Sequence, residues 1–303
     1  MLATLTDAAF DDSDWVFETK WDGFRMVACL ERGKVTLYSR NGKIISDSYL
    51  PVARALERLE FDAVLDGELV ALDRRGVSHF QLLQNALRAE ATLRYCIFDV
   101  MFLKGEDLRD LPLVERKEKL RRLVPKHPLL SFSAHRSQYG VKYFEEAMHQ
   151  GLEGIMAKRK SSKYLSGTRT TDWLKIKTAR RQEVVIAGFT APRRSRPYFG
   201  ALVLALRDGK VWRYIGHVGT GFSHRTLEEL HGKLRSLRTP SSPFGVRVKD
   251  EAVTTWVKPK LVAEVKFTEW TSAGEMRHPV FLGLREDKKA EDVTREKAKA
   301  PRR

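Results

Sequence analysis

The sequence predicts an α+β domain built on antiparallel sheets, followed by a smaller C-terminal β-barrel domain. In the first 180 of the 303 residues, strand-like and helix-like segments alternate without the regular rhythm of a parallel βαβ fold. After Thr178-Ala179-Arg180-Arg181 the segments are almost all short strands. We therefore expect a first domain over residues 1–180, a barrel over 181–288 and a charged, disordered tail over 289–303.

The strands of the first domain are predicted from alternating apolar residues and from β-branched and aromatic content. They cover residues 15–20, 24–30, 35–40, 63–72, 93–103 and 154–158. Helices are predicted over residues 51–60, 80–89, 113–123 and 142–150. In the third helix, Leu113, Lys117 and Leu120 fall near one face, with Glu115 and Lys119 elsewhere.

The second domain is predicted to contain five short strands and one internal helix. The strands cover residues 184–190, 201–206, 211–218, 254–257 and 261–270, and the helix covers 225–237. This combination fits a small closed barrel of the oligonucleotide-binding type, the OB-fold.

Charge is the clearest feature of the composition. The formal net charge is +16, and basic residues cluster at 158–160, 180–181 and 193–196. Such an excess favours a polyanionic partner, because each Lys or Arg that neutralises a phosphate releases a counterion. The alternative is a generally basic protein with no such partner.

Other classes of protein are disfavoured. Cys29 and Cys96 both lie in apolar, strand-like runs, so we expect buried thiols in a reducing cytoplasm rather than disulfides or metal ligands. No run approaches the roughly 18 apolar residues of a membrane helix, and the N-terminus lacks a signal-peptide layout. No Gly-x4-Gly-Lys-Ser/Thr loop occurs, which disfavours a P-loop ATPase.

Candidate chemistry begins at Lys20, which follows an apolar run and precedes Asp22-Gly23. A lysine held near phosphates can act as a nucleophile once its pKa falls, and neighbouring cations disfavour its charged form. Five further elements follow it in order. They are Asp66-Gly67-Glu68, Tyr95-Cys96-Ile97-Phe98-Asp99, Glu153-Gly154-Ile155-Met156-Ala157-Lys158, Asp172-Trp173-Leu174-Lys175-Ile176-Lys177, and the basic cluster of 277–279 with 284–288.

Each element also has an ordinary interpretation. Glu68 and Glu153 suit a divalent cation but are also common strand-end carboxylates. Phe98 suits stacking on a base but also suits a hydrophobic core. Lys175 and Lys177 lie on one face of a strand, which could equally be its solvated face. The ordered set of six is far less expected by chance than any one member.

In this order the elements resemble the motifs of the ATP-dependent DNA ligases, which share the covalent nucleotidyltransferase superfamily with RNA ligases and mRNA capping enzymes. The resemblance spans residues 2–288 and is greatest to ligase domains of the bacterial ligase D type. It rests further on Trp21-Asp22-Gly23-Phe24-Arg25, Ser39-Arg40-Asn41-Gly42, Val218-Gly219-Thr220-Gly221-Phe222 and Phe281-Leu282-Gly283-Leu284-Arg285-Glu286-Asp287-Lys288.

The resemblance implies that Lys20 attacks the α-phosphorus of ATP and carries AMP as a covalent adduct. The implied nucleotide contacts are Glu18 and Phe98 to adenine, Arg25 and Glu68 to the ribose region, Lys175 and Lys177 to the α-phosphate, and Arg285 and Lys288 to the β- and γ-phosphates. Glu68 and Glu153 would bind Mg²⁺ or Mn²⁺, and Arg40 would lie near the nick. From the basic clusters we expect DNA phosphate contacts by Lys158, Arg159, Lys160, Arg193, Arg194 and Arg196.

The expected function is therefore ATP-dependent sealing of 5′-phosphate/3′-hydroxyl breaks in duplex DNA, through lysyl-AMP and DNA-adenylate, in DNA repair. We expect a monomer that works in the cytoplasm on the nucleoid. Non-homologous end joining with Ku and other repair routes both stay open, as does the choice between Mg²⁺ and Mn²⁺. The rival hypotheses are an RNA ligase, a capping-type nucleotidyltransferase, or a non-catalytic DNA-binding module.

Overall fold

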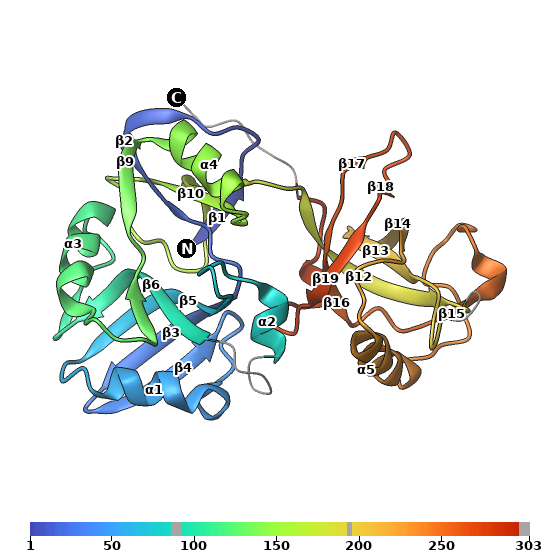
Figure 1. Cartoon of the computed structure of the whole chain (residues 1–303), viewed down its shortest axis with the longest axis horizontal. Coiled ribbons are helices and arrows are strands. Elements are labelled where there is room, and N and C mark those ends of the chain that lie inside the picture. Colours follow the sequence, from blue (N-terminus) through green and yellow to red (C-terminus); the bar gives the residue numbers. More distant parts are fainter. Residues whose placement is uncertain (86–91, 193–195, 297–303) are drawn as a thin grey trace. The chain divides into compact units, whose positions relative to one another are not determined.

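The computed structural model describes residues 1–85, 92–192 and 196–296. Within them the chain forms two compact units, Met1–Thr178 and Ala179–Glu296 (Figure 1). In both units more residues lie in strands than in helices, and most strand pairs are antiparallel. The predicted α+β fold class with antiparallel sheets is thus confirmed.

The first sheet of unit 1 has five strands in the order β1-β11-β10-β2-β9. The strands are β1 (Leu2–Leu5), β2 (Asp11–Thr19), β9 (His135–Tyr139), β10 (Gly154–Arg159) and β11 (Arg169–Lys177). All neighbours are antiparallel except β1 and β11. This sheet joins the two ends of the unit, because β1 and β2 pair with strands that lie more than 120 residues later.

The second sheet of unit 1 has six strands in the order β4-β3-β5-β6-β7, with β8 beside β6. The strands are β3 (Phe24–Glu31), β4 (Lys34–Ser39), β5 (Ala63–Leu72), β6 (Thr92–Leu103), β7 (Glu106–Asp107) and β8 (Leu130–Phe132). Arg32 and Gly33 both have positive φ in the turn between β3 and β4, as a tight hairpin requires. The sheet is long and continuous because β3, β5 and β6 follow one another as antiparallel neighbours.

Helices pack against these sheets. They are η1 (Ser46–Tyr49), α1 (Leu50–Glu57), α2 (Phe80–Asn85), α3 (Leu113–Leu123) and α4 (Gly140–His149). Val52 and Leu56 of α1 lie in the core of the second sheet, and Ala147 of α4 packs with Trp15, Phe17 and Ile155 on the first sheet. Figure 1 shows α4 along β10 and α1 beside β4. α1 and α4 therefore each bury an apolar stripe against a sheet.

Unit 2 is a curled sheet in the order β14-β13-β12-β16-β19, with β15 paired to β12. The strands are β12 (Arg181–Thr190), β13 (Leu202–Asp208), β14 (Val211–Val218), β15 (Thr254–Trp256), β16 (Val262–Lys266) and β19 (Val280–Leu284). A bridge between Thr220 and Val280 links the end of β14 to β19. The sheet thus curls toward a barrel around one apolar core, as the OB-fold prediction requires.

Two short strands and three helical segments complete unit 2. β17 (Glu269–Trp270) pairs with β18 (Met276–Arg277), so the predicted strand over 261–270 is in fact two strands. α5 (His224–Arg235) begins at Ser223, whose hydroxyl accepts a hydrogen bond from the Thr226 backbone amide. The short helices are η2 (Glu251–Val253) and η3 (Ala290–Asp292).

The structure corrects two predictions for unit 2. The segment 280–284, for which no strand was predicted, is strand β19, whose alternate residues face the core. The tail is not disordered as far as residue 296, because Ala290 and Val293 are buried and the Arg207 amide donates to the Val293 carbonyl. Gln182 also binds this segment, donating to the Thr294 carbonyl at 3.0 Å. Although the segment is mostly charged, its few apolar residues are enough to hold it against the rest of unit 2.

Across the part of the chain that the structure describes, no helix is both long enough and apolar enough to cross a membrane.

Candidate active site

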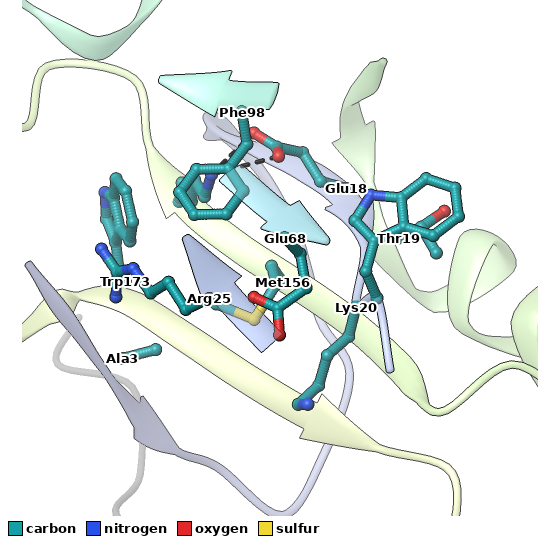
Figure 2. A pocket seen from close by; sticks show the side chains of 11 residues that line it. Ala3, Glu18, Thr19, Lys20, Arg25, Glu68, Phe98, Met156 and Trp173 are labelled. Atoms are coloured by element: carbon teal, nitrogen blue, oxygen red, sulfur yellow. Dashed lines mark hydrogen bonds and ion pairs between the residues drawn. The ribbon is translucent and has the colours of Figure 1, made fainter. Parts of the chain in front are cut away.

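A pocket opens between the two sheets of unit 1 (Figure 2). Figure 2 shows Phe98 and the Glu18 carboxylate at one end, and the Lys20 ammonium and Glu68 carboxylate toward the other. The lining residues are Ala3, Glu18, Thr19, Lys20, Trp21, Arg25, Glu68, Phe98, Met156, Lys158 and Trp173. Five of these residues, Glu18, Lys20, Arg25, Glu68 and Phe98, were predicted to act together on the nucleotide, and the pocket brings them together from separate elements of the sequence.

Strand alternation explains which residues of the first sheet reach the pocket. Met156 lies opposite Glu18 on β2 and opposite Lys175 on β11, so these three side chains share one face. The intervening residues, such as Ile155, pack under α4 on the other face. A charged face and an apolar face thus come from the same strands.

Lys20 stands directly after β2, at the edge of the pocket. Its backbone amide donates to the Gly154 carbonyl at 2.9 Å, which fixes the chain where the strand ends. Its ammonium lies 2.5 Å from Oε2 of Glu153, a carboxylate that is only 4% exposed. The structure thus brings together the predicted nucleophile and one of the predicted metal ligands.

Arg25 is held from three sides. Its guanidinium binds both carboxylate oxygens of the fully buried Asp66, at 3.0 and 2.6 Å. It also donates to the Met1 carbonyl at 2.6 Å and to the Tyr164 hydroxyl at 3.2 Å. Burial opposes the charge, but Asp66 outweighs it and raises the pKa of Arg25 above its usual range. Arg25 is therefore a fixed cation in the pocket wall.

Glu18 lies in a buried charge cluster that the sequence did not predict. Its carboxylate is 2.8 Å from the Lys117 ammonium and 3.1 Å from the Lys158 ammonium. Burial would raise the pKa of Glu18, but the two ammonium groups outweigh that effect and lower it. Burial also lowers the pKa of Lys158 to about 8, against the opposing charge of Glu18. All three side chains are almost fully buried.

The structure corrects the prediction that Lys158 contacts DNA phosphate. Its side chain is 1% exposed, and its ammonium lies 4.4 Å from the ring centre of Phe98 and 4.2 Å from that of Trp173. An ammonium enclosed by two aromatic rings and a carboxylate is out of reach of a DNA backbone. Lys158 belongs to the pocket, because its strand turns that face toward the second sheet.

Phe98 and Glu68 come from the second sheet. Phe98 lies on β6 and is partly buried. Its ring packs edge-on against that of Trp173, with the ring centres 6.0 Å apart. Glu68 lies on β5 opposite Arg25 of β3, so both side chains share a face. In residues 1–85, 92–192 and 196–296, no three or more His, Cys, Asp or Glu side chains are grouped to hold a metal ion.

Lys175 and Lys177 share the pocket-facing side of β11. Lys175 is opposite Met156 and Lys177 is opposite Gly154, so both lie along the same edge as Lys20. Both are half-buried and are not among the residues that line the pocket itself. Their positions extend the row of cations beyond Lys20.

Arg285 and Lys288 lie in unit 2 and form ion pairs with acidic residues there. Arg285 binds both oxygens of Asp287 at 2.8 Å and approaches Glu264 at 3.4 Å. Lys288 lies 2.7 Å from Glu183. Burial alone would lower the pKa of Arg285, but its acidic partners raise it well above the usual range.

The remaining predicted DNA contacts differ in exposure. Arg40 is exposed just beyond β4, whereas Arg159 is half-buried against Trp15 and 3.4 Å from Asp172. Lys160 is half-buried. Arg196 donates to the Gly219 carbonyl at 2.6 Å. Arg193 and Arg194 lie outside the described residues.

Several residues that support the pocket without lining it were missed by the sequence reasoning, notably Lys117, Asp66 and Tyr164. The signal for Lys117 was present, because it shares the apolar face of α3 with Leu113 and Leu120. A lysine on a buried helix face requires a buried acidic partner. Tyr164 donates to Asp66 at 2.7 Å from a segment without regular secondary structure, so no periodicity could have revealed it.

Comparison with family models gives two matches. Residues 1–177 match the ATP dependent DNA ligase domain, and residues 195–288 match the ATP dependent DNA ligase C terminal region. The first match covers unit 1 almost completely, and the second lies within unit 2.

Individual relatives agree. The chain is 39% identical over 299 residues to the multifunctional non-homologous end joining protein LigD of Pseudomonas aeruginosa, covering 95% of this chain and 35% of that protein. It is 38% identical over 302 residues to the corresponding DNA repair protein LigD of Mycobacterium tuberculosis strain H37Rv, covering 98% of this chain and 39% of that one. The chain thus spans less than half of either relative.

Two solved structures are also similar. Mycobacterial DNA ligase D complexed with ATP and MES has a TM-score of 0.75 and 36% identity, with 98% of this chain and 97% of that chain covered. The ligase domain of M. tuberculosis LigD has a TM-score of 0.53 and 35% identity, with 97% and 98% covered. With the family models, these likenesses establish that the chain belongs to the ATP-dependent DNA ligase family.

Proposed function

We propose that the protein is an ATP-dependent DNA ligase that seals 5′-phosphate/3′-hydroxyl breaks in duplex DNA. The observation that carries this proposal is the position of Lys20, 2.5 Å from Glu153 at the edge of a pocket lined by Phe98 and Arg25. A lysine, a carboxylate, an aromatic ring and a fixed cation are groups suited to bind a nucleotide and transfer its AMP moiety.

The proposed reaction has three steps. Nζ of Lys20, after loss of a proton, attacks the α-phosphorus of ATP; the P–N bond forms and pyrophosphate leaves. The DNA 5′-phosphate then attacks the same phosphorus, which frees Lys20 and gives DNA-adenylate. The DNA 3′-hydroxyl finally attacks the 5′-phosphorus, closing the strand and releasing AMP.

The chain's residues have distinct roles in the first step. Phe98 would stack on adenine, with Glu18 at the base edge, while Arg25 and Glu68 would contact the ribose region. Because Asp66 and Tyr164 fix Arg25, its guanidinium needs little reordering when the nucleotide binds. Lys175 and Lys177 would stabilise charge on the α-phosphate. We propose that Arg285 and Lys288 orient the leaving pyrophosphate.

The residues present fit a divalent cation. Mg²⁺ is usually held by one or two carboxylates together with substrate phosphates, and the fully enclosed donor sets of structural sites are not needed. Glu153 and Glu68 would hold Mg²⁺ or Mn²⁺. When bound, the ion would neutralise charge on the phosphate oxygens.

DNA binding is proposed from charge. The net charge of +16 and the exposed Arg40 support a sequence-independent grip on phosphates, extended by Arg159, Lys160 and Arg196 and by Arg193 and Arg194. A role in non-homologous end joining, with Ku as partner, is proposed from the similarity to the LigD proteins. The monomeric state and the location in the cytoplasm on the nucleoid stay predictions.

The test is a sealing assay on a nicked duplex with ATP, ADP, GTP and NAD compared, together with intact-mass measurement of the protein. Of the four nucleotides, we expect ATP to support sealing and the other three not to. The wild-type protein should gain the mass of one AMP. The Lys20→Ala variant should gain none, yet it should retain part of its sealing of pre-adenylated nicked DNA. Lys119→Met, which alters an exposed lysine of α3, is the control.

The same assay separates the rival hypotheses. A capping-type enzyme would take up GMP from GTP, and an RNA ligase would join RNA ends in preference to nicked DNA. A non-catalytic DNA-binding module would bind the duplex without gaining AMP from any nucleotide. Any of these results would overturn the proposal.

A further inference from the structure

The base end of the pocket contains one carboxylate between two lysines, all three shut away from solvent. Glu18, Lys117 and Lys158 are each no more than 1% exposed. Two cations around one carboxylate leave a net positive charge in a region where burying charge is costly. Such an arrangement calls for a specific role for the carboxylate.

Lys117 anchors the cluster from outside the pocket. It comes from α3, and its ammonium donates to the Ser133 carbonyl at 3.0 Å as well as contacting Glu18 at 2.8 Å. It also lies 4.7 Å from the ring centre of Phe132. Since Lys117 does not line the pocket, its position does not depend on what the pocket holds.

Lys158 is a different kind of neighbour. It lines the pocket and lies against the rings of Phe98 and Trp173, which line the pocket too. A ligand entering this end of the pocket therefore meets Lys158 directly, whereas Lys117 stays behind Glu18. Of the two lysines, Lys117 is the one that can hold Glu18 during ligand exchange.

We propose that Lys117 is a positioning residue that keeps Glu18 ionised and oriented as a hydrogen-bond acceptor, and so sets the pocket's preference for a purine with a 6-amino group. The inference rests on the proposed function, in which this pocket holds the base of ATP. It adds to that function a residue that acts through Glu18 without touching the nucleotide.

The chemistry of the two groups supports this assignment. An ionised carboxylate only accepts hydrogen bonds and offers about four lone-pair sites, of which the lysines take part. The 6-amino group of adenine is a donor and can use a remaining site. A 6-oxo group would place an acceptor against a carboxylate, and a purine without a 6-substituent would offer no partner. Without Lys117, the carboxylate keeps only its contact with Lys158, so its orientation toward the base is no longer fixed from behind.

The experiment measures lysyl-AMP formation with ATP and with purine riboside triphosphate, which lacks only the 6-amino group. We compare wild type, Lys117→Met, Glu18→Gln and the double variant, with Lys119→Met as the matched control on the same helix. The readout is the ratio of kcat/KM for the two nucleotides. We expect a high ratio in wild type and a fall of about 10- to 100-fold in Lys117→Met, mostly through KM, which corresponds to one charge-assisted hydrogen bond.

The double variant isolates the route of action. If Lys117 acts through Glu18, adding Lys117→Met to Glu18→Gln changes the ratio less than twofold further. The double variant also removes the carboxylate that Lys117→Met would leave short of a partner, so it serves if the single variant does not fold. Lys119→Met should leave the ratio unchanged.

Two results would overturn the inference. One is a Lys117→Met variant that is active with both nucleotides at the wild-type ratio, since a merely structural lysine would lower both rates together. The other is a double variant in which Lys117→Met lowers the kcat/KM ratio of Glu18→Gln by as large a factor as it lowers that of the wild type. A wild-type protein that gains no nucleotide at all would instead overturn the proposed function, so the two failures are distinguishable.

Discussion

The ammonium of Lys20 lies 2.5 Å from Oε2 of Glu153, where the end of β2 meets the start of β10. The contact is possible because the Lys20 amide donates to the Gly154 carbonyl, which brings the two strand ends together. A nucleophile and a carboxylate separated by 133 positions in the sequence thus form an ion pair in a half-buried site. The pair is a direct target for mutation.

Replacing Glu153 by Gln should reduce lysyl-AMP formation by about a hundredfold, the order of loss found when one preorganised electrostatic group is removed from an active site. The amide keeps the shape of the side chain but cannot supply a charge to Lys20 or to a cation. The measurement is the single-turnover rate of labelling from radioactive ATP. Glu145→Gln, at an exposed position of α4, is the control. Labelling at the wild-type rate would show that Glu153 has no part in the first step.

Replacing Lys158 by Met should impair nucleotide transfer and leave the salt dependence of DNA binding unchanged. The reason is that Lys158 is 1% exposed and faces Glu18, Phe98 and Trp173. The measurements are lysyl-AMP formation and the slope of log affinity against log salt.

Lys160→Met, two residues along the same segment and half-buried, is the matched comparison. If Lys160 contacts a phosphate, its loss reduces the salt slope by about 0.9. A reduced slope in Lys158→Met would instead restore the original prediction that Lys158 binds DNA.

Replacing Arg285 by Ala should slow self-adenylylation much more than the sealing of pre-adenylated DNA. The proposed target of Arg285 is the pyrophosphate, which has already left before the sealing step. Arg285→Lys keeps the charge but loses the two-point contact with Asp287, so we expect an intermediate rate. The measurement compares single-turnover rates for the two steps.

Arg285 also has a structural role, because its removal leaves Asp287 and the buried Glu264 without their guanidinium. The thermal midpoint of each variant therefore accompanies its rates, with the exposed Arg277→Ala as control. Equal losses in both steps would contradict a role confined to ATP.

Replacing Arg193, Arg194 and Arg196 together by Ala should weaken binding to nicked DNA equally for all sequences and flatten its salt dependence. Each lost phosphate contact reduces the slope by about 0.9. AMP uptake should stay intact, because Arg196 is not among the residues that line the pocket and all three arginines belong to the basic run expected to contact DNA phosphate. The measurement is a titration of a labelled nicked duplex at several salt concentrations.

The control removes the same number of charges elsewhere. Arg109, Arg121 and Arg122 are exposed and pair with Asp107 or Glu118, so their replacement by Ala alters the net charge equally. If both triple variants show the same salt slope, the arginine segment is only a solubilising surface and the prediction is wrong.

Local pattern was enough to predict much of the fold. The strand over 63–72 and the helix over 113–123 have the predicted bounds, because two-residue and 3.6-residue periodicities are properties of the chain itself. Alternation also predicted that Lys175 and Lys177 share one face of a strand. The sequence determined Lys20 as the candidate nucleophile through its neighbours and the order of the elements that follow.

Tertiary structure decided what covers each face. Alternation puts Lys158 on the same face as Met156, but only the packing of the second sheet turns that face into the wall of a pocket. The basic run 158–160 therefore looked like a DNA contact, although its first member is enclosed. The pairing of Lys117 with Glu18 depends on the same packing, since the two residues are 99 positions apart. Periodicity assigns a side chain to a face, whereas long-range packing decides whether that face meets solvent, a core or a ligand.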